Sequence, residues 1–575
     1  MKSEPSLPFK RLQIRSEELL SQYERPYDPD EAHLPIEWLR KNARDRPDAI
    51  AHELCDEPDD EQIRTLTFGQ SDERSNIMAN WLLQKHNVQH GKPIGVMRKR
   101  DEHFYIAMAA ILKAGCCYLP IDKDLPNERK EFIIRDSNAA LLLTDEEGAG
   151  AGLASKPSFN MDDFSIQKEI AQYDSTAPNV KVDLDDLAYI LYTSGTSGNP
   201  KGCLLMHRGL YWAIKMFVEI PSKVTNPDTD KRLAMAAVAF DVHVSEMVQG
   251  WAIGTRLVSI SSRMSLLADL QGTIERFGIT HIGMVPSMIE ATLTKSPSEL
   301  PLKYITSGGE KINDKVLQKW ASHPGILFGN LYGPTEATIG CTARIIRGTD
   351  EPKEDIGHAF VGSGAYIADS DLNILPKGVS GELIIEGPLV ARGYLNLPEA
   401  TKKNFIEWPR KGCRAYRTGD LVRMNFDGSL SIHGRIDSQI KLRGVRIESE
   451  GVSAVISNAS KQSRIDAVSV ICKHEAVGNA DMLVTFITPS IQKEKSKDSK
   501  SANERRGKPE VRELEDGQLM DTLRKASVEG LASYMRPSHI IPLTFFPLSH
   551  NGKIDTKPLA SLFAETSMPT LMKVQ

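Results

Sequence analysis

The stretch that decides the fold runs Tyr192-Thr-Ser-Gly-Thr-Ser-Gly-Asn-Pro-Lys-Gly202. It follows Leu187-Ala-Tyr-Ile-Leu191, a short apolar run that is typical of a buried strand. Successive backbone N–H groups of a glycine-rich loop can form a concave nest that holds an anion. The hydroxyl groups add donors and the lysine adds a positive charge, so a polyphosphate suits this loop best. The alternative interpretation is a polar surface turn, which leaves the long Thr/Ser/Gly run before Pro-Lys-Gly unexplained.

The loop differs from the common P-loop, in which Gly-x-x-x-x-Gly-Lys-Ser/Thr runs into a helix. Here Pro200 precedes Lys201 and Gly202 follows it. A proline and a glycine on either side of the lysine favour a mobile, hairpin-like loop over the start of a helix.

Helical and strand patterns alternate around this loop. Residues 75–84 and 104–113 carry apolar side chains at helical spacing, and the second helix is predicted to stop at Gly115. Strands are predicted at 94–97, 117–120 and 141–144, and the alternation recurs from 233 to 286. This order indicates parallel α/β architecture.

The sequence pattern changes twice towards the C-terminus. From 369 to about 437, short strands alternate with Gly, Asn and Asp turns, which predicts a small β unit. The expected organisation is α/β: a loosely attached lead-in at 1–45, a large N-terminal core at 46–436, and a small mobile α+β domain at 437–575. Residues 490–516 are crowded with Lys, Glu, Arg and Ser and are predicted to be a disordered insertion. Its charges are mixed, which disfavours a basic-patch role.

Composition narrows the classes of partner. The 575 residues carry a net charge of -5, which argues against nucleic acid or an anionic membrane. No apolar leader and no run of ~18 apolar residues is present, so a cytoplasmic protein is expected. The seven cysteines form no Cys-x-x-Cys pair, and adjacent Cys116 and Cys117 suit core packing better than a redox pair.

Two further segments carry residues suited to a nucleotide. In Asn330-Leu-Tyr-Gly-Pro-Thr-Glu336, Tyr332 offers a ring for stacking on a base, and Glu336 offers a carboxylate for Mg²⁺ beside phosphates. Tyr416-Arg-Thr-Gly-Asp420 ends in a carboxylate that can accept from the vicinal hydroxyls of a ribose. Each motif alone is weak evidence for a nucleotide site.

Taken in order, these motifs resemble the adenylate-forming enzymes, specifically the amino-acid-activating adenylation domains of nonribosomal peptide synthetases. The resemblance covers residues 65–557 and includes the strings 112–122, 381–385, 434–448 and 551–555. It implies that ATP and a carboxylic acid form an acyl-adenylate with release of pyrophosphate. The acyl group would then pass to the phosphopantetheine thiol of a carrier protein, with Mg²⁺ and a lysine neutralising charge in the first step.

The resemblance also implies residue roles. Lys553 would be the mobile catalytic lysine and Asp437 the hinge, although a surface lysine and an ordinary linker aspartate are the plain alternatives. Glu336 would hold Mg²⁺. Tyr332 would stack on adenine, Thr335 would contact the α-phosphate, and Asp420 would bind the ribose. The implied ATP-binding residues are Thr193, Ser194, Gly195, Thr196, Lys201, Gly309, Glu310, Tyr332, Thr335, Asp420 and Arg435.

The acid that is activated is predicted from residues 239–245. There Asp241 matches the family's carboxylate for an α-ammonium group, which needs such a partner because a buried lone charge is costly. His243 departs from the Ser that is usual in the family, as either a packing or a pocket change. The implied substrate-binding residues are Asp241, Val242, Ser245, Gly283, Ile305, Ser307, Leu331, Ile339 and Gly340. Apart from Asp241 they are small or uncharged, which predicts a bulky, uncharged amino acid, with an aromatic one ahead of Leu.

Two other functions compete with this one. An acyl- or aryl-acid ligase that transfers to coenzyme A shares the chemistry but usually lacks Asp241. A nucleotide-binding scaffold without turnover is disfavoured by Lys553, Glu336 and Asp420. No Gly-Gly-x-Ser carrier motif follows 551–555, so a carrier is expected in trans or elsewhere in a larger synthetase.

Overall fold

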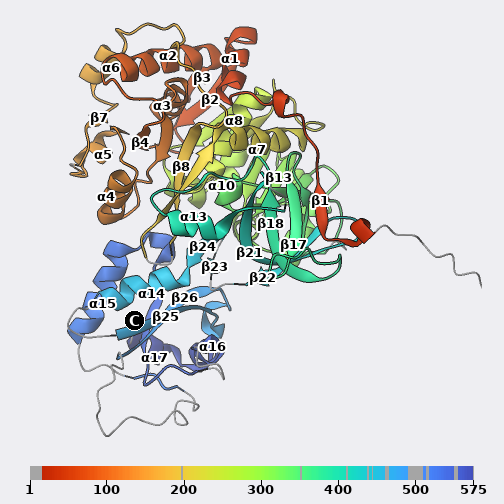
Figure 1. The fold of residues 1–575 in the computed structure, drawn as a ribbon. Coiled ribbons are helices and arrows are strands. Elements are labelled where there is room, and N and C mark those ends of the chain that lie inside the picture. Colours follow the sequence, from red (N-terminus) through yellow and green to blue (C-terminus); the bar gives the residue numbers. More distant parts are fainter. Residues whose placement is uncertain are drawn as a thin grey trace, which may run out of the picture.

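The structure is a computed structural model of the chain (Figure 1). It describes residues 16–153, 155–195, 198–349, 352–409, 412–436, 439–442, 444–459, 465–489, 509–512, 517–548 and 554–573. Thr196, Asp437 and Lys553 lie outside the described residues, as do 1–15 and most of 490–516. Within that last stretch, Val511 forms an isolated bridge with Leu543.

The first sheet carries the Thr/Ser/Gly loop. Its strands, in spatial order, are β19 (Gly393–Tyr394), β9 (Lys201–Met206), β8 (Leu187–Thr193), β5 (Cys117–Pro120), β4 (Pro93–Met97), β6 (Leu142–Thr144) and β7 (Ser158–Asn160). β8, β5, β4, β6 and β7 run parallel, whereas β9 and β19 are antiparallel to their neighbours. The helices that precede, connect and follow these strands are α2 (Phe68–Gln84), α3 (Glu102–Lys113), α4 (Asn127–Asp136), α5 (Glu146–Gly150), α6 (Phe164–Ile170) and α7 (His207–Glu219).

Local sequence explains where the two longest helices of this region begin. The Thr67 side chain accepts from the Gln70 N–H and Gln70 returns a bond to Thr67, a capping box that starts α2. Asp101 accepts from the Phe104 N–H at the start of α3, and Gly115, at φ +66°, follows its end. The strands and helices predicted at 75–120 are therefore confirmed.

The second sheet is continuous over two kinds of architecture. Its parallel part comprises β14 (Leu327–Tyr332), β13 (Tyr304–Gly308), β12 (His281–Met284), β10 (Lys231–Leu233), β11 (Arg256–Ile260) and β2 (Ile50–Cys55), with β3 (Arg64–Thr67) antiparallel at the edge. Its helices are α1 (Ile36–Asp45), α8 (Val242–Ile253), α9 (Arg263–Ala268), α10 (Leu270–Phe277), α11 (Pro286–Thr292) and α12 (Asp314–Val316).

The antiparallel part of that sheet contains the small β unit predicted at 369–437 and adds strands from 22–24 and 342–368. It comprises β1 (Gln22–Glu24), β17 (Gly364–Ala368), β18 (Ser380–Glu386), β21 (Arg414–Met424), β22 (Leu430–Arg435), β16 (Asp355–Ala359), β15 (Thr342–Ile346) and β20 (Phe405–Glu407), with α13 (Pro398–Asn404) beside it. Because β1 pairs with β17, and Leu39 of α1 is fully buried, the described part of 1–45 packs on the core rather than hanging from it loosely.

The C-terminal unit has its own sheets and hydrophobic clusters. A hairpin is formed by β23 (Gln439–Leu442) and β24 (Val445–Glu448), and a second sheet by β25 (Ile465–Cys472), β26 (Met482–Pro489) and β27 (His539–Pro542). The helices are α14 (Ser449–Asn458), α15 (Gly517–Gly530), α16 (Thr556–Glu565) and α17 (Met568–Lys573). Figure 1 shows this unit beneath the core, with β23 and β24 reaching up to it. The predicted α/β core with a smaller α+β C-terminal unit is confirmed.

Candidate active site

The Thr/Ser/Gly loop is a hairpin connection, as its Pro-Lys-Gly end predicts. Thr193, at the end of β8, pairs with Lys201, at the start of antiparallel β9. A Cβ atom on Gly195 would overlap the Asn199 carbonyl oxygen, so the turn requires glycine there. Gly198 has φ +89°, which only glycine adopts readily. The described part of the loop therefore has the tight backbone that an anion-binding nest needs.

Three residues predicted for the nucleoside meet where β14 ends at Tyr332 and β22 ends at Arg435, beside Asp420 within β21. The Tyr332 hydroxyl donates to Asp420 Oδ2 at 2.5 Å, and Arg435 Nη1 lies 3.1 Å from Asp420 Oδ1. Asp420 and Arg435 are cross-strand partners, which brings them together. Both Tyr332 and Asp420 are buried. The grouping suits a base and its ribose, because the ring and the carboxylate share one wall.

Glu336 lies in a short turn (Thr335–Ala337) directly after β14 and is buried. Its Oε1 accepts from the Tyr394 hydroxyl at 2.6 Å, and its Oε2 lies 3.2 Å from Arg446 Nη1. Burial opposes ionisation, but Arg446 and the Tyr394 hydroxyl outweigh it and hold the pKa of Glu336 below its usual range. A carboxylate kept ionised beside the loop is chemically suited to Mg²⁺.

Asp241 stands at the start of α8 without capping it. Burial raises its pKa to about 6, although the Thr335 hydroxyl and the Ile339 N–H oppose the rise. Among the described residues its Oδ2 has no hydrogen-bond partner. A buried carboxylate with one unused oxygen is a site that a cation would complete.

The other predicted pocket residues come from one helix, three strands and one turn. Val242 and Ser245 lie on α8, Gly283 on β12, Ile305 and Ser307 on β13, Leu331 on β14, and Ile339 and Gly340 in the turn before β15. Thr338 and Ile339 both have positive φ, +50° and +71°, so this turn is strained.

Both pocket glycines lie close to a neighbouring side chain. A Cβ on Gly283 would come within 2.9 Å of the Thr306 hydroxyl. A Cβ on Gly340 would come within 2.8 Å of the Phe217 ring. Gly340 is therefore required by packing and does not add volume as the sequence suggested. His243 is also a packing residue, since it bonds to the Tyr118 hydroxyl at 3.1 Å.

Comparison with known proteins decides the family. The AMP-binding enzyme family matches residues 39–395. The chain belongs to this family. It is an adenylate-forming, ATP-dependent ligase, and its relatives bear out the predicted resemblance to the adenylation domains of nonribosomal peptide synthetases.

The relatives are much longer proteins. Coprinoferrin synthetase of Coprinopsis cinerea is 41% identical over 560 residues, which cover 94% of this chain and 23% of that protein. Nonribosomal peptide synthetase NPS2 of Ceriporiopsis subvermispora is 42% identical over 532 residues, covering 89% of this chain and 21% of that protein. The chain therefore spans less than a quarter of the length of these curated relatives.

Solved structures agree on the fold. Holo-PA1221, a nonribosomal peptide synthetase protein with adenylation and carrier (PCP) domains, has a TM-score of 0.72 at 20% identity, covering 92% of this chain and 84% of its own. The o-succinylbenzoate CoA synthetase of Bacillus subtilis also scores 0.72 at 20% identity, covering 91% and 98%. Both show the fold that positions the ligase's site.

The hairpin β23–β24 of the C-terminal unit lies directly on this site. Arg446 reaches Glu336, and the Arg446 carbonyl accepts from the Ser194 hydroxyl at 3.1 Å. Lys201 Nζ lies 3.4 Å from Glu448 Oε1. Thus the predicted phosphate lysine and the predicted Mg²⁺ carboxylate both pair with the hairpin in this arrangement.

A second hairpin cation lies over the predicted base platform. Lys441 Nζ is 5.6 Å from the centre of the Tyr332 ring. Burial lowers the pKa of Lys441, and Asp420 opposes the shift. Beside it, Gly309 lies against the Gly444 backbone, while Glu310 is held by the Ser287 N–H and hydroxyl at 3.0 Å each.

Sequence reasoning assigned no role to Lys441, Arg446, Glu448 or Tyr394. The first three lie within the motif 434–448, whose density of charge was a usable signal. Tyr394 belongs to β19 and has no local sequence signature. Its hydroxyl reaches Glu336 because β19 pairs with β9, a contact between distant segments.

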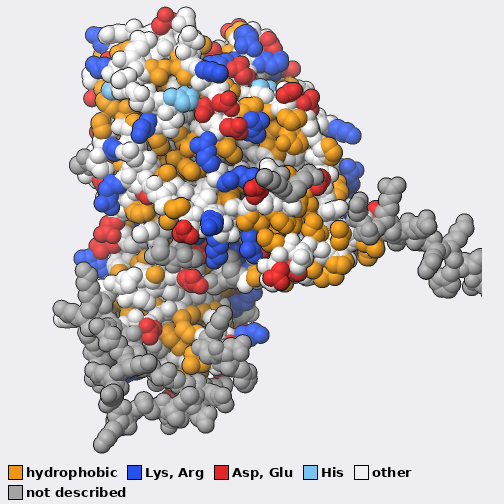
Figure 2. Space-filling view, viewed as in Figure 1, with side chains coloured by type: hydrophobic (Ala, Val, Ile, Leu, Met, Phe, Trp, Pro, Cys, Tyr) orange, Lys and Arg blue, Asp and Glu red, His pale blue; other side chains and the backbone are white. Residues whose placement is uncertain are grey.

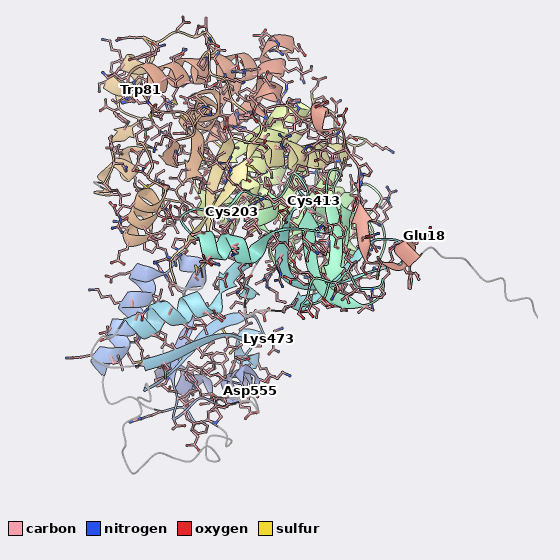
Figure 3. All side chains as sticks on the ribbon, in the orientation of Figure 1. Glu18, Trp81, Cys203, Cys413, Lys473 and Asp555 are labelled. Carbon is pink, nitrogen blue, oxygen red and sulfur yellow. The ribbon has the colours of Figure 1, made fainter. Side chains whose placement is uncertain are left out.

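Asp555, the last residue of the motif 551–555, lies away from the candidate site. Asp555 caps α16, and Figure 3 shows it in the C-terminal unit, far from Cys203 on β9. No group of three or more His, Cys, Asp or Glu side chains gathers as a metal site among the described residues. Within the same residues, no helix is both long and apolar enough to cross a membrane. On the face in Figure 2, acidic and basic side chains are interspersed, which does not suit a polyanion surface.

Proposed function

We propose that the ligase activates an α-amino acid as its aminoacyl-adenylate, releases pyrophosphate, and passes the aminoacyl group to the phosphopantetheine thiol of a carrier. The observation that carries this is Asp241, a buried carboxylate with an unused oxygen beside Thr335 and Glu336. An α-ammonium there places the substrate carboxylate towards the loop. The names of the relatives, nonribosomal peptide synthetases, support the carrier as acceptor.

In the first step the chain's own residues position and neutralise ATP. Tyr332 holds the base and Asp420 the ribose, while the loop's N–H groups and Lys201 hold the phosphates. Glu336 would hold Mg²⁺, which when bound neutralises charge on the phosphates as pyrophosphate leaves. Lys553 is proposed to bridge the substrate carboxylate and the α-phosphate.

The two steps need two different arrangements of the C-terminal unit. Lys201 and Glu336 are paired with Glu448 and Arg446 here, so they cannot serve Mg²⁺ and phosphates at the same time. We assign the present arrangement to the transfer step, with Asp437 as the hinge between the two.

The substrate side chain is proposed to be bulky and uncharged, with an aromatic one favoured. Buried Ile305 and Ser307, neither of which carries a charge, support an uncharged occupant. ATP–pyrophosphate exchange across proteinogenic and common nonproteinogenic amino acids tests this. Strongest exchange with Asp, Lys or Gly would refute the pocket argument.

A coenzyme A ligase is the second candidate, favoured by the equal TM-score of o-succinylbenzoate CoA synthetase. Asp241→Ala separates the two functions. The substitution abolishes exchange in an amino-acid enzyme, whereas an aryl-acid enzyme keeps it.

A further inference from the structure

Arg129 of α4 is a buried cation that the proposed reaction does not use. Its side chain joins three separate parts of the molecule. Nη2 donates to the carbonyl oxygen of Gly198 in the loop at 2.9 Å, and Nε donates to the carbonyl oxygen of Gly530 at the end of α15 at 2.8 Å. Nη1 lies 3.6 Å from the sulfur of Met535. One guanidinium thus links the core, the loop and the C-terminal unit.

This arrangement is unusual for an arginine because carbonyl groups replace a carboxylate. Among the described residues, no Asp or Glu lies within ion-pair distance of Arg129, and burial lowers the pKa of its guanidinium. Much of its desolvation is therefore compensated by two carbonyl oxygens that meet only when the C-terminal unit is docked. If that unit withdraws, the bond to Gly530 is lost.

A second contact also holds the loop. Gly451 of α14 packs so closely on Gly195 that a Cβ on Gly451 would overlap the Gly195 carbonyl oxygen. The cavity that borders Thr193, Ser194 and Arg129 is closed on one side by Tyr534 of the C-terminal unit. The docked unit and a loop filled with phosphates therefore compete for the same space.

We propose that Arg129 is a positioning residue that latches the C-terminal unit onto the emptied loop, and so couples pyrophosphate departure to the transfer step. The inference rests on the proposed two-step reaction. Arg129 binds the loop through a carbonyl, so the latch closes only when the loop has its present backbone shape. It assists transfer without contacting the reacting atoms.

The test compares Arg129→Gln and Arg129→Lys with a matched control, Arg135→Gln, on the exposed side of the same helix. Among the residues that the structure describes, the Arg135 side chain bonds only to the Glu131 carbonyl. Two rates are measured: ATP–pyrophosphate exchange, and aminoacyl transfer to free pantetheine as the acceptor thiol. Docking is followed by energy transfer between dyes at exposed positions Glu146 and Lys525.

For Arg129→Gln we expect transfer to fall at least tenfold and exchange to change less than threefold, with a smaller docked fraction. Arg129→Lys is intermediate, and Arg135→Gln behaves as the unmodified chain. Equal loss of both rates, or an unchanged docked fraction, would overturn the latch. If the unmodified chain shows no exchange with any amino acid, the proposed function fails, while the dye measurement still decides the latch.

Discussion

Replacement of Gly451 by alanine separates the folding of the C-terminal unit from its docking. Gly451 lies in the first turn of α14, and an added Cβ would come closer than 3.0 Å to the Gly195 carbonyl oxygen, a separation that real Cβ atoms do not show. The obstacle is backbone, so no side chain can rotate away. Overpacking of this kind costs about 1–3 kcal/mol, which corresponds to roughly a 5- to 150-fold loss of docking.

The same substitution favours the helix itself. Alanine is better than glycine in a helix by about 1 kcal/mol, so the free energy of unfolding of the C-terminal unit does not fall. We therefore expect transfer to pantetheine to drop 5- to 150-fold, with pyrophosphate exchange and the melting temperature preserved. Gly517→Ala in α15 is the control, because its Cβ would meet nothing within 4 Å. Full transfer activity in Gly451→Ala would refute the contact as the basis of docking.

Three further predictions concern the site. Asp241→Asn should lower amino-acid-dependent exchange at least 100-fold and leave ATP binding intact. In the unchanged chain the amino-acid KM should rise as pH falls through about 6, because the raised pKa of Asp241 leaves its carboxyl protonated below that pH and the ammonium loses its partner; a KM that is flat from pH 5 to 8 would contradict this. Tyr332→Phe removes the donor to Asp420 and should weaken ATP binding by about 1–2 kcal/mol, read by titration calorimetry. Glu336→Gln should raise the Mg²⁺ concentration needed for half-maximal exchange, and an unchanged Mg²⁺ titration would remove the residue from the metal's ligands.

Local sequence patterns predict the helices and strands of this fold better than they predict which strands pair with each other. The capping residues of α2 and α3 and the Pro-Lys-Gly end of the loop are visible in the sequence because they act within a few residues. The pairing of β1 with β17 is not visible, since more than 300 residues separate the strands and neither carries a distinctive pattern. The described part of 1–45 therefore belongs to the core, against expectation.

The site divides in the same way. Tyr332 and Asp420 were identifiable because each offers a side chain suited to a nucleotide, and the structure brings them within 2.5 Å. The strand-to-turn element predicted to end at Asp420 is instead a strand that continues to Met424. The contacts of Arg446 and Glu448 depend on how the C-terminal unit sits against the core, which no periodicity encodes. The prediction that Gly340 adds pocket volume was wrong for another reason. A glycine leaves open space only where no neighbour fills it, and the Phe217 ring fills the space beside Gly340.

The charges of the candidate site explain how the β23–β24 hairpin can take the place of a bound nucleotide. Glu336 is buried beside Arg446, and Lys201 is largely buried beside Glu448. Withdrawing the hairpin with nothing in its place would leave these charges without partners, at a cost of several kcal/mol where they stay buried. Mg²⁺ and the phosphates of ATP offer the same two partners with matching signs: a cation for Glu336 and an anion for Lys201. Exchange of one set for the other is therefore close to balanced, and a small bias, such as the Arg129 bridge to Gly530, is enough to decide which set occupies the site.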